Sequence, residues 1–326
     1  MGSQWSQFFP PKPNFTEADV PSQAGKVFLI TGGASGIGFE LAKILYGKNG
    51  RVYIAGRSQA KAEQAIKDIQ TAVSTPTTGS LQFLHLELDD LSSIKATTET
   101  FRSKESKLHV LWNNAGVSRP PLDSVSKQGI ELQLATNCLG PFLLTQLLLP
   151  LLQAASSEES AAPGSVRVVW AASQVIELSS PSGGLVMSEL DDPPRDSSRT
   201  YTNSKTGNWF LASELAQRAG PSSSIVSVAH NPGAASTNLF RHTPSVKYLA
   251  WPLLHKPQQA ALTVLYAGLS KDIGLETNGC YVVPWGRIST TMRQDLVDAT
   301  RPVGEGGSGR ATEFWDFCVD KTRQYQ

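Results

Sequence analysis

Short apolar runs alternate with longer amphipathic stretches from residue 27 to about residue 283. Polar residues, glycine or proline bound each short run, which predicts a buried strand. The longer stretches carry apolar positions at helical spacing, which predicts helices that pack on the strands. This alternation predicts right-handed crossovers and one parallel sheet covered on both faces, so the expected fold class is α/β with a doubly wound sheet. The expected strands are 27–30, 52–55, 81–86, 110–112, 166–171, 225–229 and 281–283, and the expected helices are a stretch ending at residue 48 and residues 59–72, 91–103, 130–149, 203–218 and 257–270.

The pattern predicts one domain with two appended segments. Residues 1–25 hold four prolines among polar and aromatic residues, which predicts an extended arm. Residues 26–300 form the predicted domain, and residues 301–326, with four glycines, form a tail that could be a mobile lid or a partner surface. Insertions near 177–199 and 234–256 interrupt the alternation. Loops beyond the carboxyl ends of the strands form the binding crevice of such a sheet, so both insertions are candidate substrate loops, although a surface insertion without ligand contact explains 177–199 equally well.

Composition narrows the classes of protein. The chain has 326 residues, of which 40% are hydrophobic and 17% charged, enough for a large core without long disordered segments. The net charge of +1 gives no overall field for polyanions, so nucleic acid is not an expected partner. Cys138, Cys280 and Cys318 are widely spaced, which predicts a reducing, cytoplasmic location without a disulfide framework. No histidine has a cysteine or carboxylate at ligand spacing, so no metal is expected.

Membrane attachment has one weak signal. No run reaches the roughly 18 consecutive apolar residues of a membrane-spanning helix. The start of the chain, with Gly2 and Ser6, matches the loose pattern for N-myristoylation, which would give weak membrane association. Chance matches to this pattern are common, so an unmodified segment is the preferred interpretation.

A glycine-rich turn follows the first predicted strand, in the order Thr31-Gly32-Gly33-Ala34-Ser35-Gly36-Ile37-Gly38. Glycines allow a tight turn and close approach of the backbone to a pyrophosphate at the amino end of the next helix. Such a turn alone is weak evidence, but its position between strand and helix predicts a Rossmann-type dinucleotide-binding domain.

The end of the second predicted strand bears on the choice of dinucleotide. NAD-specific folds usually place an acid there for the ribose hydroxyls, whereas Gly56 occupies that position here and Arg57 follows it. A guanidinium suits planar contact with the 2′-phosphate of NADP(H). A solvated surface arginine is the alternative.

Tyr201 and Lys205 stand four residues apart, so on a helix both side chains project from one face. A tyrosine has a reference pKa near 10, and a neighbouring ammonium favours the phenolate and lowers that pKa. The pair therefore suits proton transfer, although this spacing is common by accident.

The ordered set of motifs resembles a known family. The glycine turn, Asn113-Asn114-Ala115-Gly116, Asn137, Ser173 and the Tyr201/Lys205 pair follow one another as in the short-chain dehydrogenase/reductases. The resemblance covers the chain from Lys26 to about Pro284. The stretch from Thr136 to Thr145 is most similar to the branch that holds the retinol dehydrogenases and their fungal relatives.

This resemblance implies roles for the matching residues. Tyr201 would be the general acid or base, Ser173 would orient and polarise the substrate oxygen, and Lys205 would hold the nicotinamide ribose and lower the tyrosine pKa. Asn137 would support a water in the proton relay. The segment Asn231-Pro232-Gly233 with Thr237 resembles the turn that meets the nicotinamide carboxamide. The implied cofactor contacts are Gly32, Ser35, Gly36, Ile37, Gly38, Arg57, Glu87, Leu88, Asn114, Ala115, Gly116, Tyr201, Lys205, Pro232, Gly233 and Thr237.

Two features depart from the family pattern. Glu87 stands where relatives commonly have an aspartate beside the adenine, and the interval from Ser173 to Tyr201 is long. His230 lies close to the cofactor strand, where a lone histidine is more often a packed core residue than a catalyst.

The expected function is hydride transfer between NADP(H) and a carbonyl or alcohol carbon of a relatively apolar small molecule, in the direction of carbonyl reduction. Apolar residues in the second insertion could cover the site or simply pack in the core; they are Leu239, Phe240, Tyr248, Trp251 and Leu253. The alternatives are an NADP(H)-binding sensor or scaffold and a non-redox enzyme that uses the same pocket. A homodimer through the helices expected at 130–149 and 203–218 is a further prediction, taken from relatives that often pair this way.

Overall fold

The computed structural model describes residues 2–243, 248 and 253–326. Its centre is a sheet in the order β3-β2-β1-β4-β5-β6-β7-β8, in which β8 alone runs antiparallel to its neighbour. The crossover lies between β1 and β4, so the two halves of the sheet wind in opposite directions from that point. The predicted α/β class with a doubly wound parallel sheet is confirmed.

The elements cover most of the described chain. The strands are β1 (Val27–Thr31), β2 (Arg51–Gly56), β3 (Ser80–His85), β4 (Val110–Asn113), β5 (Arg167–Ala171), β6 (Val226–His230), β7 (Tyr281–Val283) and β8 (Arg287–Ile288). The α-helices are α1 (Gly2–Phe8), α2 (Gly36–Gly47), α3 (Gln59–Ala72), α4 (Leu91–Arg102), α5 (Leu132–Leu134), α6 (Gly140–Ser156), α7 (Val175–Ser179), α8 (Ser188–Asp191), α9 (Ser197–Ser223), α11 (Pro257–Leu269), α12 (Gln294–Ala299) and α13 (Arg310–Thr322). A π-helical turn, η2 (Ala135–Leu139), joins α5 to α6, and short 3-10 turns are η1 (Glu17–Asp19), η3 (Asn238–His242), η5 (Leu275–Thr277), η6 (Val303–Glu305) and η7 (Arg323–Tyr325).

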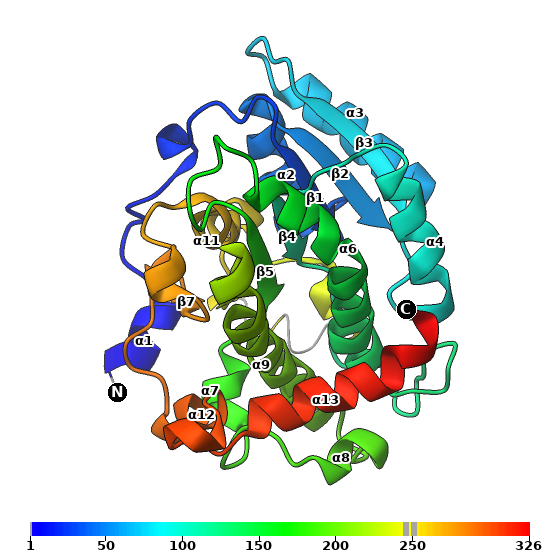
Figure 1. The fold of residues 1–326 in the computed structure, drawn as a ribbon, viewed down its shortest axis with the longest axis vertical. Coiled ribbons are helices and arrows are strands. Elements are labelled where there is room, and N and C mark those ends of the chain that lie inside the picture. The colour runs from blue at the N-terminus through cyan, green and yellow to red at the C-terminus, as the bar shows by residue number, and fades with distance from the viewer. Residues whose placement is uncertain (1, 244–247, 249–252) are drawn as a thin grey trace.

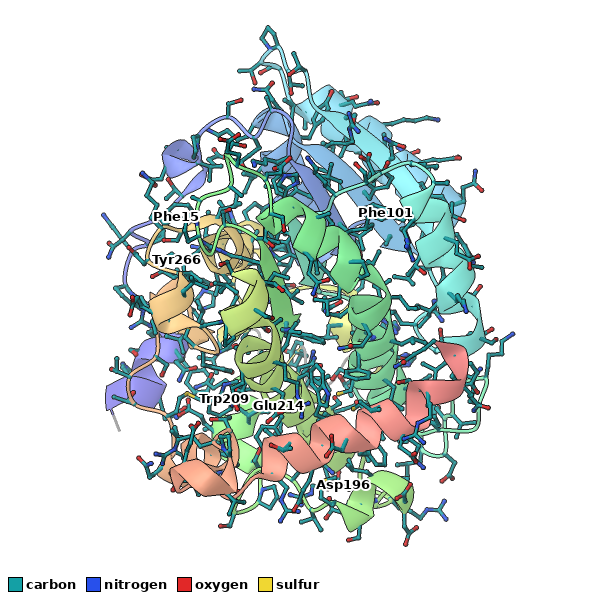
Figure 2. The ribbon with its side chains drawn as sticks, viewed as in Figure 1. Phe15, Phe101, Asp196, Trp209, Glu214 and Tyr266 are labelled. Carbon is teal, nitrogen blue, oxygen red and sulfur yellow. The ribbon has the colours of Figure 1, made fainter. Side chains whose placement is uncertain are left out.

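Helices cover both faces of the sheet because its strands are apolar on both sides. In β1, Leu29 packs into one core with α4, α6 and α9, while Ile30 packs into a second core with α2, α3 and α11. Figure 1 shows these two helical layers around the sheet. Phe101 of α4 and Tyr266 of α11 mark the two cores in Figure 2.

Each predicted strand overlaps an observed one, and helix α3 has the predicted bounds. Helix α9 begins earlier than expected, at Ser197, because Asp196 caps it. The Asp196 carboxylate accepts hydrogen bonds from the amides of Ser198 at 2.8 Å and Arg199 at 3.3 Å. Tyr201 and Lys205 therefore both lie within a regular helix.

The prediction of a wholly extended N-terminal arm is wrong. Residues 2–8 form helix α1, which contacts the body of the protein. Local sequence does not reveal this, because a seven-residue helix depends on the tertiary contacts that it makes.

The C-terminal segment is part of the domain rather than a mobile tail. Helix α13 crosses α6 and α9, as Figure 1 shows, and Phe314, Trp315 and Cys318 are buried in the same core as those helices. The glycines that suggested mobility instead form the turn before α13, where Gly306 and Gly309 adopt positive φ angles.

One described segment, Leu132–Ser156, is long and apolar enough to span a membrane, with a mean hydropathy of 1.6. Because 67% of that window is buried inside the fold, its composition is that of a core helix.

Candidate active site

A cleft of about 880 Å³ opens at the carboxyl ends of the parallel strands. The loops that follow β1 through β6 each contribute to its lining, as expected for a sheet of this topology. It contains most of the residues singled out by the sequence, namely Gly32, Ser35, Gly36, Ile37, Arg57, Leu88, Asn114, Ala115, Gly116, Ser173, Tyr201, Lys205, Pro232, Gly233 and Thr237.

The glycine turn forms a close-packed cradle at the amino end of α2. Gly32 and Gly36 have φ angles of +69° and +57°, and a Cβ on Gly36 would lie 3.1 Å from the Thr237 side chain. Gly38 lies behind the turn, where a Cβ would approach the Gly32 carbonyl at 2.7 Å. The Ser35 side chain does not cap α2, so the first amides of the helix are left to an anionic group. The cradle fits a dinucleotide pyrophosphate.

Thr31 ties this turn to the neighbouring loop after β4. Its hydroxyl accepts hydrogen bonds from the amides of Asn114 at 3.0 Å and Ala115 at 2.9 Å, and its carbonyl accepts one from the Asn114 side chain at 2.9 Å. Three hydrogen bonds thus hold the loop after β4 against the glycine turn.

The adenosine end of the cleft is marked by Arg57, which pairs with Asp89 at 3.2 Å. Arg241 lines the same cleft and lies within electrostatic range of Arg57. Glu87, by contrast, is outside the described cleft lining and pairs with His85 at 3.2 Å. Leu88 and Asp89, the next two residues, line the cleft, and the contact of Glu87 with the cofactor stays a prediction.

Helix α9 brings the proton-transfer residues to the other end of the cleft. The ammonium of Lys205 lies 5.7 Å from the Tyr201 ring centroid and donates to the Ala171 carbonyl at 2.8 Å. Ser173 follows β5 in the same cleft and lies near enough to Tyr201 to influence the pKa of its hydroxyl. The structure thus brings the predicted tyrosine, lysine and serine together.

Burial dominates the ionisation of these groups. It raises the pKa of Tyr201, and this is opposed first by the nearby Arg119 and then by hydrogen bonds with Ser173 and Ser118. The expected lowering of the Tyr201 pKa by Lys205 is therefore not found. Burial also lowers the pKa of Lys205 to about 8.

Asn137 lies in the π-helical turn and is 1% exposed, behind the cleft lining rather than in it. Its side chain exchanges hydrogen bonds with the backbone of Val117 at 2.8 and 3.0 Å and donates to the Ser204 hydroxyl at 2.9 Å. Asn137 therefore links the loop after β4 to α9, which carries Tyr201.

His230 ends β6 beneath the cleft. It is 1% exposed, neither ring nitrogen has a partner among the described residues, and burial lowers its pKa to about 3. The ring is thus neutral at pH 7 and forms part of the cleft floor.

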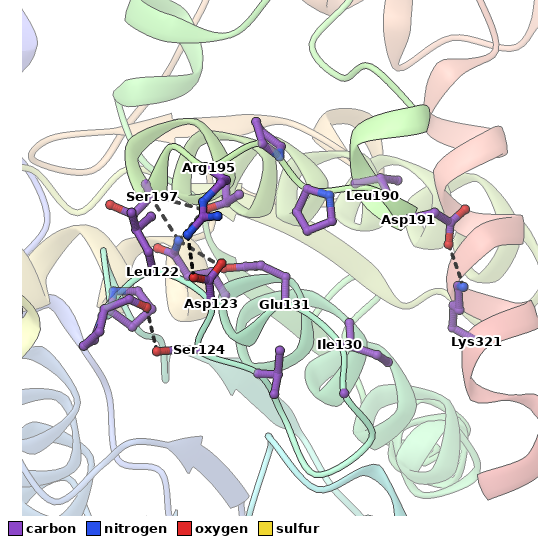
Figure 3. A pocket seen from close by; sticks show the side chains of 18 of the residues that line it. Leu122, Asp123, Ser124, Ile130, Glu131, Leu190, Asp191, Arg195, Ser197 and Lys321 are labelled. Carbon is purple, nitrogen blue, oxygen red and sulfur yellow. Dashed lines mark hydrogen bonds and ion pairs between the residues drawn. The ribbon is translucent and has the colours of Figure 1, made fainter.

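The two insertions behave differently. Of residues 177–199, all of which are described, Leu178 alone lines the cleft. The part of this insertion from Leu190 to Ser197 helps to form a separate surface pocket of about 340 Å³ with the loop before α5 and with α13 (Figure 3). Asp123 pairs there with Arg195, and Asp191 pairs with Lys321. In the second insertion, Leu239 lines the cleft, Tyr248 is 83% exposed, and Trp251 lies outside the described residues.

Sequence analysis did not identify Arg119, although its guanidinium lies 5.5 Å from the Tyr201 ring centroid. It also overlooked Phe8, which lines the cleft from α1. Neither belongs to a local motif, and only the folded chain brings them to the site.

Comparisons with known proteins identify the class. The profile of the short chain dehydrogenases matches residues 26–246. A short-chain dehydrogenase/reductase of Pestalotiopsis fici is 43% identical over 96% of this chain and 95% of its own length. One from Neocamarosporium betae is 41% identical over 100% of this chain and 94% of its own length.

Solved structures agree on the fold. A crystal structure of an uncharacterised protein from Mycobacterium paratuberculosis has a TM-score of 0.70 and 27% identity, and covers 95% of this chain and 98% of its own. The Pseudomonas aeruginosa RhlG/NADP complex has a TM-score of 0.61 and 22% identity, and covers 81% of this chain and 95% of its own.

The chain belongs to the short-chain dehydrogenase/reductase family. It is therefore an oxidoreductase that uses a nicotinamide cofactor and acts on a small molecule, and the glycine cradle and the lysine of the cleft fit such a cofactor.

Proposed function

We propose that this protein is an NADP(H)-dependent carbonyl reductase for relatively apolar aldehydes or ketones. One observation carries the proposal: Tyr201, Ser173 and Lys205 line one end of a cleft whose other end holds the glycine cradle and Arg57. A phosphate-binding end and a proton-transfer end in one cleft are what nicotinamide-linked reduction requires.

The cofactor preference rests on the adenosine end. Gly56 offers no carboxylate to a ribose hydroxyl, and a Cβ there would meet no atom within 4 Å, which leaves space for a phosphate. Arg57 and Arg241 supply positive charge, and Arg57 keeps guanidinium donors free beside the one that pairs with Asp89. NADP(H) is therefore favoured over NAD(H).

The residues of the cleft divide the work. The cofactor supplies the hydride. The Tyr201 hydroxyl donates a proton to the substrate oxygen, and the Ser173 hydroxyl holds that oxygen by a second hydrogen bond. Lys205, with its pKa near 8, stays largely protonated at pH 7 and binds the nicotinamide ribose. Asn137 positions the loop after β4 against α9.

The expected substrate is relatively apolar because the end of the cleft near Ser173 carries apolar side chains, including Val175, Leu178 and Leu239. A sensor or scaffold that binds NADP(H) without turnover, or a non-redox enzyme in the same pocket, remains the alternative class. We also propose a cytoplasmic location, in line with three cysteines that are all free.

The test is NADPH consumption, followed by absorbance, over a panel of aldehydes and ketones of graded size and polarity. Tyr201→Phe removes the proton donor but leaves the cradle intact, so turnover should fall by at least about 100-fold while NADPH affinity stays within about twofold. NADPH binding without turnover of any carbonyl would favour the sensor or non-redox alternative. Substantial turnover in the variant would move the proton donor to another group.

A further inference from the structure

The N-terminal helix α1 lies against the end of the cleft that holds Ser173. Figure 1 shows α1 beside β7, far along the sheet from β3 at the opposite edge. Phe8, the last residue of α1, lines the cleft together with Ser173, Gln174 and Pro232. A segment about 160 residues away in sequence thus contributes an aromatic side chain to the substrate end of the site.

Gln7 anchors this helix from a buried position, with 3% of its surface exposed. Its amide donates to the Glu177 carboxylate at 2.7 Å, and its carbonyl oxygen accepts from the Asn231 side chain at 2.9 Å. Glu177 belongs to α7, which follows Ser173 after β5, and Asn231 begins the turn after β6. One glutamine side chain therefore joins the two segments that flank the reaction centre.

Further hydrogen bonds hold α1 in the same place. The Gln174 side chain donates to the Gln4 side chain at 3.1 Å, and Arg287 donates to the Ser6 carbonyl at 2.9 Å. The His255 ring lies 3.0 Å from the Phe8 carbonyl oxygen. The buried Gln7 amide has hydrogen-bond partners for both its nitrogen and its oxygen, and three further contacts hold the helix. Helix α1 is therefore fixed in place against the cleft.

We propose that α1 is a fixed wall of the substrate pocket, in which Phe8 is a specificity-determining residue that contacts the apolar substituent of the carbonyl and Gln7 is its positioning residue. This inference rests on the proposed reductase function. The chemistry that recognises the substrate here is aromatic contact close to the carbonyl carbon, so compounds with a bulky apolar substituent depend on Phe8 and short ones do not.

The test compares Phe8→Ala with Phe9→Ala in the full chain. Phe9 is the adjacent residue, is 48% exposed and lies outside the described cleft lining, so its variant controls for the loss of a phenyl group. Phe8→Ala should lower the ratio of kcat/KM for bulky over short apolar aldehydes by about tenfold. NADPH affinity should stay within about twofold, and Phe9→Ala should resemble the unmodified protein.

The role of Gln7 is tested by exchanging the hydrogen-bond donor and acceptor between Gln7 and Glu177. Gln7→Glu places a carboxylate against that of Glu177, so KM for bulky aldehydes should rise while kcat for short ones is unchanged. The double variant Gln7→Glu with Glu177→Gln restores the pattern, because the new carboxylate accepts from both Asn231 and the new amide. If Gln7 only contributed to stability, Gln7→Glu would lower activity toward bulky and short aldehydes alike, and the size preference would not change in either variant.

The outcomes separate the two proposals. If Phe8→Ala leaves the size preference unchanged, or lowers kcat/KM equally for all aldehydes, the proposed role of α1 is overturned. The proposed reductase function is unaffected by either result. If the unmodified protein reduces no carbonyl, the reductase fails, and calorimetric binding of the same panel to the protein with NADPH then tests the wall. If the protein then binds bulky compounds and Phe8→Ala weakens that binding, the proposal for α1 is supported. If Phe8→Ala leaves the binding unchanged, or if no bulky compound binds, the proposal for α1 is overturned.

Discussion

Arg57 forms an ion pair with Asp89 at the end of the cleft that we propose for the 2′-phosphate of NADP(H), where Arg241 adds a second positive charge. Arg57→Asp would set a second carboxylate beside Asp89. We expect NADPH affinity to fall at least about tenfold and NADH affinity to change little, because only the phosphate would face the added negative charge. Fluorescence titration with both cofactors measures this.

Lys61→Asp is the matched control for Arg57, since it makes the same charge change on the exposed surface of α3, outside the described cleft lining. It should leave both affinities within about twofold. Equal losses for NADPH and NADH in Arg57→Asp would contradict the assignment of NADP(H).

We expect Arg119 to influence a second property of the site, the pH range of the proposed reduction. Its guanidinium opposes the effect of burial on Tyr201, so Arg119→Met should raise the Tyr201 pKa further. Reduction needs the protonated tyrosine and declines as pH rises through that pKa. The alkaline limb of kcat/KM should therefore move to higher pH in Arg119→Met and stay close to its original place in Arg119→Lys, which keeps the charge. A limb that moves to lower pH would show that another group titrates.

At the scale of elements, periodicity predicted the strands and the main helices because each must bury an apolar face of known period. The alternation of strands and helices also predicted a crevice at the carboxyl ends of the strands, whereas the residues of the site were implied by the family resemblance. Periodicity did not predict α1, because the polar groups that hold Gln7 and Phe8 lie more than 160 residues away. Nor does periodicity decide which of the neighbouring carboxylates after β3 faces the cleft, since this depends on how the loop turns.

Helix α9 carries Tyr201 and Lys205, so its amino end should matter for stability. Asp196 caps that end, at the foot of the molecule in Figure 2. Asp196→Ala leaves two amides without this acceptor and should lower the free energy of unfolding by about 1 kcal/mol, measured by denaturant titration. Asp196→Ser keeps a capping oxygen and should lose less. An Asp196→Ala variant as stable as the unmodified protein would show that the cap contributes nothing.

At the scale of the whole molecule, α13 occupies the surface through which a homodimer was expected. Trp315 packs edge-on against Phe142 of α6 at 4.9 Å between ring centroids, and Phe314 is fully buried beside α9. Gly207 allows this close approach, because a Cβ there would lie 2.6 Å from the Phe314 ring. Helix α13 of the same chain thus covers the apolar faces of α6 and α9.

This arrangement predicts a monomer in which α13 takes the place of a second subunit. Removal of residues 310–326 would expose the apolar side chains beneath α13, and we expect concentration-dependent self-association in sedimentation experiments. Phe314→Ala keeps the helix but leaves a cavity where the buried phenyl ring packs, and it should lower the free energy of unfolding by about 3 kcal/mol. Asp316→Ala is the control, since that side chain is 70% exposed. A full-length dimer that α13 variants do not alter would show that the chain pairs through a different surface.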